Sequence, residues 1–288
     1  MRVNFKMRMF IALAIAAFVV IGYYSKGSFN EITGEKQYIN LTVDQEIQLG
    51  LDGRDYMIQQ SGGLYPDRQV QEYITAIGNK IVQSSDAARS PYKYNFHVLA
   101  DPNTVNAFAM PGGQIFITAG LLKRLESEHQ IAGVLGHEIA HVVARHSAQQ
   151  MAKNDLTQGL AGAAGVLGGD MSSAQYAQMI GQMVNMRYGR EDELESDDLG
   201  VRFMMQAGYD PTHMMRVMEI LAEASGGSSQ PEFASTHPSP DNRIQRIRES
   251  IEKYSQSLPT TSAAPETPTP STQQPQFSDD AVTIPAQR

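Results

Sequence analysis

Residues 131–143 form an almost continuous apolar segment that nevertheless carries two histidines and a glutamate. His137, Glu138 and His141 lie there among Ile, Val, Leu, Ala and Gly. Burying ionisable groups is unfavourable unless each one has a hydrogen-bonding or charged partner. The chain must therefore fold so that this segment becomes a buried helix and other elements bring partners to these three side chains.

The spacing of the three residues favours a metal ion as that partner. Residues at positions i and i+4 of a helix lie on one face with their Cβ atoms about 5–6 Å apart. Two imidazoles at that separation can bind one zinc ion through bonds of about 2.0–2.1 Å. We therefore expect His137 and His141 to be ligands of one Zn²⁺ and Glu138 to activate the attacking water, as in the His-Glu-x-x-His motif. A chance pair on an exposed helix is the alternative, and the apolar flanks disfavour it.

A catalytic zinc site needs a third protein ligand and one open position. The metzincin pattern is excluded because it would place glycine and histidine where this chain has Ala144 and Ser147. His146 comes one residue too early for that pattern, and on a continuous helix it is expected to point elsewhere. The third ligand must therefore come from another element.

The acidic segment 190–200 can supply the third ligand. Glu193 and Asp197 share one helical face, with apolar residues nearby. We expect Glu193 to bind the metal and Asp197 to hydrogen-bond a ligand histidine, an arrangement that fixes the ligand's orientation. The other acids of the segment are expected to be solvated, as clustered charges usually are; they are Glu191, Asp192, Glu195 and Asp198.

The distribution of apolar residues and turn signals predicts an α+β fold. Strand-like alternation covers 92–99, and 106–110 and 114–118 read as a hairpin across Pro-Gly-Gly. The expected helices cover 70–81, 121–125, 128–151, 176–186, 191–206, 211–226 and 240–254. We expect a mainly helical, gluzincin-type zinc metallopeptidase domain, with a small antiparallel sheet beside the active-site helix.

The two ends of the chain differ in composition from this domain, which we place at 42–254. Basic residues precede an apolar run at 9–24, so residues 1–26 are expected to be a signal anchor in the inner membrane or a cleaved signal peptide. Residues 255–288 are rich in Pro, Thr, Ser and Gln and are expected to be a disordered tail. The glycine-rich segment 159–169 fits either a loop or a closely packed helix.

Composition excludes several other functions. The formal net charge is -8, and non-specific nucleic-acid binding needs clustered positive charge instead. The chain has no cysteine, which removes thiolate ligands and disulfides. A purely structural zinc site, normally closed by four ligands that include Cys, is therefore disfavoured.

Four segments in order resemble metallopeptidase family M48, which includes the prenyl proteases, the HtpX-like proteins and the periplasmic BepA-like proteins. They are Asn106–Gly113 (Asn-Ala-Phe-Ala-Met-Pro-Gly-Gly), the His-Glu-x-x-His motif, Glu193–Asp197 (Glu-Leu-Glu-Ser-Asp) and His237-Pro238 followed by Arg243-Ile244. The resemblance implies that Glu193 is the third ligand, with Ser196 in place of the family's alanine. The single short apolar run departs from the multi-spanning branches and favours the BepA-like branch.

The resemblance also implies an edge strand beside the zinc that pairs with an extended substrate. The residues expected to bind substrate are Asn106, Ala107, Phe108, Ala109, Met110, Gly112 and Gly113. His237 is expected either to stabilise the oxyanion or to occupy the fourth zinc position in a latent enzyme.

Together these features predict a zinc-dependent endopeptidase of the bacterial cell envelope, facing the periplasm. We expect it to hydrolyse unfolded or misassembled envelope proteins. A chaperone or assembly factor that binds clients in the same groove is the alternative. The oligomeric state is not indicated.

Overall fold

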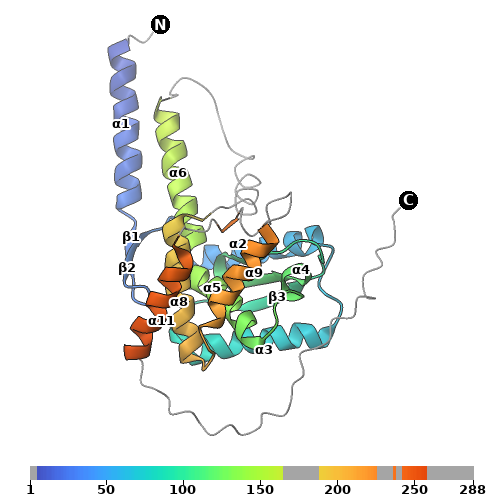
Figure 1. Ribbon diagram of the computed structural model, residues 1–288. Helices are drawn as coiled ribbons and strands as arrows, with labels where there is room; N and C mark the ends of the chain where they lie inside the picture. The colour runs from blue at the N-terminus through green and yellow to red at the C-terminus, as the bar shows by residue number, and fades with distance from the viewer. Residues whose placement is uncertain (1–4, 165–187, 226–235, 238–241, 258–288) are drawn as a thin grey trace, which may run out of the picture.

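The structure is a computed structural model that describes residues 5–164, 188–225, 236–237 and 242–257. Helices surround a small sheet, and two further helices project from this body (Figure 1). The helices are α1 Phe5–Tyr24, α2 Val43–Gln60, α3 Arg68–Ser84, α4 Ala119–Leu122, α5 Glu128–Val143, α6 His146–Ala164, α8 Arg190–Gln206, α9 His213–Ser225 and α11 Arg243–Ser257. The strands are β1 Gly27–Asn30, β2 Glu35–Tyr38, β3 Asn95–Leu99, β4 Ala107–Met110 and β5 Gln114–Thr118. The α+β class with a mainly helical body is confirmed.

The larger sheet has the strand order β3-β5-β4. The predicted hairpin is present, because β4 pairs antiparallel with β5 across a tight turn at Pro111–Gly113. The strand β3 pairs parallel with β5, so the sheet is mixed rather than antiparallel throughout. The reason is that the chain crosses from β3 to the far edge of the sheet, forms β4 there, and only then returns to fill the centre as β5.

The hairpin turn is fixed by its contact with α2. Gly112 has a φ of 77°, and a Cβ there would lie 2.4 Å from the Cα of Ile47. Only glycine accepts both the left-handed conformation and this approach. Gly113, with a φ of 100°, would similarly place a Cβ 2.7 Å from the carbonyl oxygen of Lys93.

The buried helix α5 lies at the centre of the core and packs against α8, α9 and α3. Its closest neighbour is α8, and a glycine permits the close approach. A Cβ on Gly200 would lie 3.2 Å from the backbone nitrogen of His137. This short interhelical distance brings side chains of α8 to the ligand face of α5.

The prediction of one continuous helix over 128–151 is wrong. The helix α5 ends at Val143, and α6 starts anew at His146. Between them Arg145 has a φ of 56°, and it is the only non-glycine residue with positive φ among those described. Its guanidinium forms an ion pair with Glu46 of α2, a carboxylate that is 2% exposed. Tyr92 also donates its hydroxyl to Glu46, at 2.8 Å.

The other predicted elements match the structure to different degrees. The helices predicted over 70–81 and 191–206 correspond to α3 and α8, and Asp67 caps α3 through the backbone N–H of Gln69. The helices expected over 211–226 and 240–254 correspond to α9 and α11, displaced by a few residues. The expected strand over 92–99 is shorter, since β3 begins at Asn95.

Two predictions fall largely outside the part of the chain that is described. The helix expected over 176–186 lies entirely outside it, and so does the tail expected over 255–288 except for residues 255–257, which are not disordered but form the end of α11. The glycine-rich segment is described only to residue 164, where it forms the end of α6. The helix α2 and the β1–β2 hairpin were not predicted.

The apolar N-terminal run forms α1, which packs along α6 (Figure 1). Gly159 allows this contact, because a Cβ there would lie 2.8 Å from Cγ1 of Val19. Within the described residues, no helix combines the length and apolarity needed to cross a membrane.

Candidate metal centre

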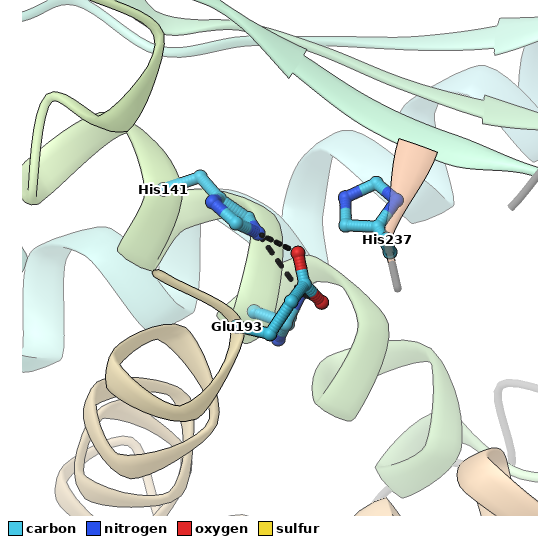
Figure 2. A group of neighbouring side chains, drawn as sticks. His141, Glu193 and His237 are labelled. Atoms are coloured by element: carbon cyan, nitrogen blue, oxygen red, sulfur yellow. Dashed lines mark hydrogen bonds and ion pairs between the residues drawn. The ribbon is translucent and has the colours of Figure 1, made fainter. Parts of the chain in front are cut away.

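Four buried side chains converge at the junction of α5 and α8. They are His137 and His141 from α5, Glu193 from α8, and His237 from the segment before α11, and their ligand atoms lie within 4.8 Å of one another. Figure 2 shows Glu193 pointing between His141 and His237. The two Nε2 atoms of His137 and His141 are 3.0 Å apart, and both lie within 3.5 Å of the Glu193 carboxylate.

This donor set fits a metal ion. Neither carboxylate oxygen of Glu193 makes a hydrogen bond, although the residue is fully buried. The guanidinium of Arg243 lies 3.3 Å from Oε2, but it already donates to Asp197. A carboxylate in that position is costly unless a cation compensates for the lost hydration. Imidazole nitrogens and a carboxylate oxygen are ligands that Zn²⁺ accepts in a tetrahedral arrangement.

The far side of His137 is held by an acidic and a basic group. Its Nδ1 lies 2.9 Å from Oδ1 of Asp197. Arg243 donates to both oxygens of Asp197, at 2.7 and 2.9 Å, and its Nη2 is 3.3 Å from Oε2 of Glu193. With Nδ1–H donating to Asp197, Nε2 of His137 is left to face the metal position. Asp197 thus contacts a proposed ligand histidine, as the sequence analysis expects, and Arg243, which has no expected role there, holds Asp197 in place.

Burial and this ion pair shift the pKa values of the centre in opposite directions. Burial alone would lower the pKa of His137, but the hydrogen bond to Asp197 and the nearby carboxylate of Glu193 raise it to about 9. Burial lowers the pKa of His237 to about 4 and holds that of His141 well below its ordinary value. Two of the imidazoles are therefore neutral at pH 7, as ligands must be.

The acidic groups also differ. Burial raises the pKa of Glu138 to about 8. Burial would raise the pKa of Glu193 too, but the surrounding imidazoles of His237, His137 and His141 hold it well below its ordinary value. Glu193 thus stays an anion, while the pKa of Glu138 lies near neutral pH, as suits a group that takes up and then releases a proton.

Two sequence interpretations near His141 are wrong. His146 is fully buried, and its Nδ1 lies 2.9 Å from Nδ1 of His141 instead of pointing elsewhere. Glu195, expected to be solvated, lies 3.0 Å from Nε2 of His146, and its side chain is only 27% exposed. The break at Arg145 is the reason, since it redirects the chain and turns His146 back toward the ligand.

Tyr188 is a further residue that the sequence did not indicate. Its ring stacks on His141 with centroids 4.0 Å apart. Its hydroxyl lies 3.0 Å from that of Ser147 and donates to the carbonyl of Ala109, at 3.3 Å. Tyr188 therefore connects the ligand helix to the edge strand. An isolated tyrosine between two expected helices gives no signal of this role.

The predicted substrate strand lies beside the centre, with β4 at the edge of the sheet and in contact with α5. Ala107, Ala109 and Met110 are buried, and Phe108 is half-buried. Asn106 is also buried and pairs with Thr118 through its carbonyl. Gly112 and Gly113 are accounted for by the turn, because their missing Cβ atoms make room for α2 and for Lys93.

The buried helix, the donor set and the glutamate beside it define a metallopeptidase of the His-Glu-x-x-His-plus-glutamate class. The sequence pattern of Peptidase family M48 matches residues 68–251, and the chain belongs to this family. Every candidate ligand lies inside the matched region. The predicted family is thereby confirmed.

Curated relatives carry related names. The chain is 31% identical over 221 residues to the beta-barrel assembly-enhancing protease of Escherichia coli K12, covering 72% of this chain and 44% of that protein. It is 33% identical over 226 residues to the putative beta-barrel assembly-enhancing protease of Vibrio cholerae, covering 74% and 46%. The mitochondrial metalloendopeptidase OMA1 of Schizosaccharomyces pombe is 31% identical over 237 residues, covering 79% and 67%. The chain thus spans less than half the length of the two bacterial relatives.

Proposed function

We propose that this protein is a zinc-dependent endopeptidase in which His137, His141 and Glu193 hold one Zn²⁺. The observation that carries the proposal is the convergence of these donors, with the carboxylate oxygens of Glu193 lacking hydrogen bonds in a buried site. Glu138 follows the first ligand on the same helix. Its Oε1 is 3.6 Å from Nε2 of His237.

The proposed mechanism follows from the positions of the side chains. When bound, zinc supplies Lewis-acid polarisation of the scissile carbonyl and lowers the pKa of water. Glu138 takes a proton from the attacking water and later gives it to the leaving amine nitrogen. Asp197 and Arg243 hold His137 in the tautomer whose Nε2 faces the centre.

Of the two roles left open for His237, the closed geometry favours the latent one. His237 is 1% exposed and lies within ligand distance of the other three donors. A donor in that place fills the position that a substrate carbonyl would need. We infer that the segment carrying His237 has to move before a peptide can reach Glu138.

The substrate we propose is an extended, unfolded segment of a cell-envelope protein. An edge strand next to the catalytic glutamate binds backbone rather than a particular side chain, which suits unfolded chains. The names of the bacterial relatives connect those proteins with β-barrel assembly, which supports an envelope location. Large apolar side chains of α1 are also exposed, among them Phe10, Leu13 and Phe18, and we propose that they bind an apolar partner in the envelope.

The test is degradation of casein by the full chain, compared with Glu138→Gln and His237→Ala, with zinc content measured for each. We expect about one zinc per chain in all three proteins, because neither substitution removes one of the three proposed ligands. His237→Ala should cut faster than the wild type, and Glu138→Gln should not cut at all. Absence of zinc from the wild type would show that the proposal is wrong.

Client binding without cutting is the second candidate, since the same edge strand could hold an unfolded chain. It would be favoured if neither the wild type nor His237→Ala cuts casein while Glu138→Gln still binds casein as tightly as the wild type does. Equal zinc content in the three proteins would then show that the centre is intact.

A further inference from the structure

We propose that His146 and Glu195 form a positioning relay that sets the tautomer of His141 and so leaves Nε2 of His141 free for the metal. This inference rests on the proposed metal site. It adds two residues that make no contact with the metal position, and it gives the turn between α5 and α6 a function.

The relay begins at Glu195. Its Oε2 lies 3.0 Å from Nε2 of His146. A carboxylate only accepts hydrogen bonds, so Nε2 of His146 must carry the proton. In the neutral imidazole the other nitrogen, Nδ1, then has a lone pair and can only accept.

The second step passes from His146 to the ligand. Nδ1 of His146 is 2.9 Å from Nδ1 of His141. Because Nδ1 of His146 accepts, Nδ1 of His141 must carry a proton and donate it. The lone pair of His141 is thereby placed on Nε2, the atom that faces His137 and Glu193. The hydroxyl of Ser196, 3.2 Å from Nδ1 of His146, is a second donor to the same acceptor.

The reverse order of donors would disable the site. If Nδ1 of His146 carried the proton, Nδ1 of His141 would have to accept it, and the proton of His141 would move to Nε2. That tautomer has no lone pair on Nε2 to offer a metal ion. In a neutral His146 the hydrogen bond to Glu195 excludes this arrangement, because it keeps the single ring proton on Nε2.

Acidic residues of α8 therefore orient both ligand histidines, one directly and the other through His146. His137 reaches Asp197 directly, at 2.9 Å, whereas His141 reaches Glu195 through His146. Both acids belong to α8, which also carries Glu193. His146 can enter this position only because α5 ends before it and Arg145 turns the chain.

A purely structural role for His146 predicts a different outcome. A buried histidine that only fills space and satisfies hydrogen bonds would, when changed, lower the stability of the metal-free protein. A positioning role instead lowers zinc affinity even where metal-free stability is unchanged. Glu195 separates the two because its side chain is partly exposed, so water can take the place of its carboxylate at Nε2 of His146 in the metal-free chain.

The experiment measures zinc affinity of the full chain by competition with a chelator, and unfolding of the metal-free chain by urea. The variants are Glu195→Ala, Glu195→Gln and His146→Leu. The matched control is Glu191→Gln, which removes the same charge from an exposed position on α8.

We expect Glu195→Ala and His146→Leu to lower zinc affinity by about 10- to 100-fold, as loss of a ligand's orienting partner does in other sites. Glu195→Gln should lower zinc affinity less than Glu195→Ala, because its amide oxygen still accepts from Nε2–H of His146. Glu191→Gln should bind zinc as the wild type does. Metal-free stability of Glu195→Ala should match that of the control.

The relay would be overturned if Glu195→Ala bound zinc as tightly as Glu191→Gln does. It would also be overturned if the relay variants lost zinc affinity only in proportion to a loss of metal-free stability. In either case tight zinc binding by the wild type leaves the proposed endopeptidase standing. If the relay variants weaken zinc while the wild type and His237→Ala cut nothing, the relay holds and the proposed function fails. A wild type that binds no zinc overturns both.

Discussion

The left-handed residue between α5 and α6 gives a quantitative prediction. In most helical contexts alanine is more stabilising than glycine, by about 1 kcal/mol. At position 145 we expect the opposite order. Arg145 has a φ of 56°, so an alanine there keeps the backbone strain while losing the ion pair with Glu46. A glycine loses the ion pair and relieves the strain.

The magnitude follows from the burial of the pair. Removing one member of a buried ion pair costs about 3–5 kcal/mol, because the other charge stays buried. The Glu46 side chain is 2% exposed and that of Arg145 19%, so water can partly replace the guanidinium and the lower value applies. The left-handed conformation costs an alanine about 1–2 kcal/mol, and a glycine avoids this strain. Part of that gain is lost because glycine has the greater conformational entropy in the unfolded state. We therefore expect losses of about 3 kcal/mol for Arg145→Ala and about 2 kcal/mol for Arg145→Gly.

Urea unfolding of the metal-free chain at pH 7 measures both variants, with equal m values as the sign that only stability has changed. Glu46→Gln should cost less than either variant, because the amide still accepts from Tyr92 and the charge left without its partner is that of Arg145, which is the more exposed member of the pair. The reasoning is refuted if Arg145→Ala proves as stable as Arg145→Gly, or if either differs from the wild type by less than about 1 kcal/mol.

Three further predictions concern the contacts of α8 and the metal. Gly200→Ala should cost about 1–3 kcal/mol and weaken zinc binding, because its Cβ would lie 2.9 Å from Cε of Met214 and 3.2 Å from the backbone nitrogen of His137. Gly133→Ala on α5 is the control, since its Cβ would lie 3.5 Å or more from the neighbouring elements; in the same unfolding and zinc-competition assays it should leave zinc binding unchanged and raise stability by up to about 1 kcal/mol. Asp198→Asn should cost about 2 kcal/mol at pH 7 by urea unfolding, since Asp198 accepts from Ser250 and Tyr254 at 2.6 Å each. Burial would raise the pKa of Asp198, but these hydrogen bonds lower it below its ordinary value. Its ionised carboxylate therefore contributes fully to the folding stability above pH 3.8. The difference in stability between the wild type and Asp198→Asn should disappear as the pH falls through the lower pKa of the folded state. Removing zinc with a chelator should lower the melting temperature, by an amount corresponding to about 2.7 kcal/mol if free zinc had been 100-fold above its dissociation constant.

The local sequence was sufficient to predict the ligand helix and much of the centre. His137 and His141 share a face because both lie on one helix, and the apolar residues around them required that helix to be buried. Glu193 and Asp197 follow the same i, i+4 rule on α8. The hairpin and its turn were predicted because Pro-Gly-Gly restricts the chain to few conformations.

The partner of His141 could not be predicted, because it depends on the backbone conformation of Arg145. On a continuous helix His146, five residues after His141, points away from the ligand face. An arginine gives no sign that it will adopt a left-handed conformation, and this one does so because Glu46 is held nearly 100 residues earlier in the chain. Glu195 and Asp198 were interpreted as solvated because the helices that cover them, α6 and α11, lie far from them in the sequence.

The proposed ligands come from α5, α8 and a segment after α8, so the ribosome synthesises them at different times. His137 and its orienting partner Asp197 are 60 residues apart. A ribosome that adds about 5–20 residues per second needs roughly 3–12 s to make that stretch. Throughout this interval the two histidines of α5 exist without their acidic partners. The nascent chain therefore cannot assemble the centre until most of the matched region has been made, and the timing of translation itself delays the appearance of a reactive site.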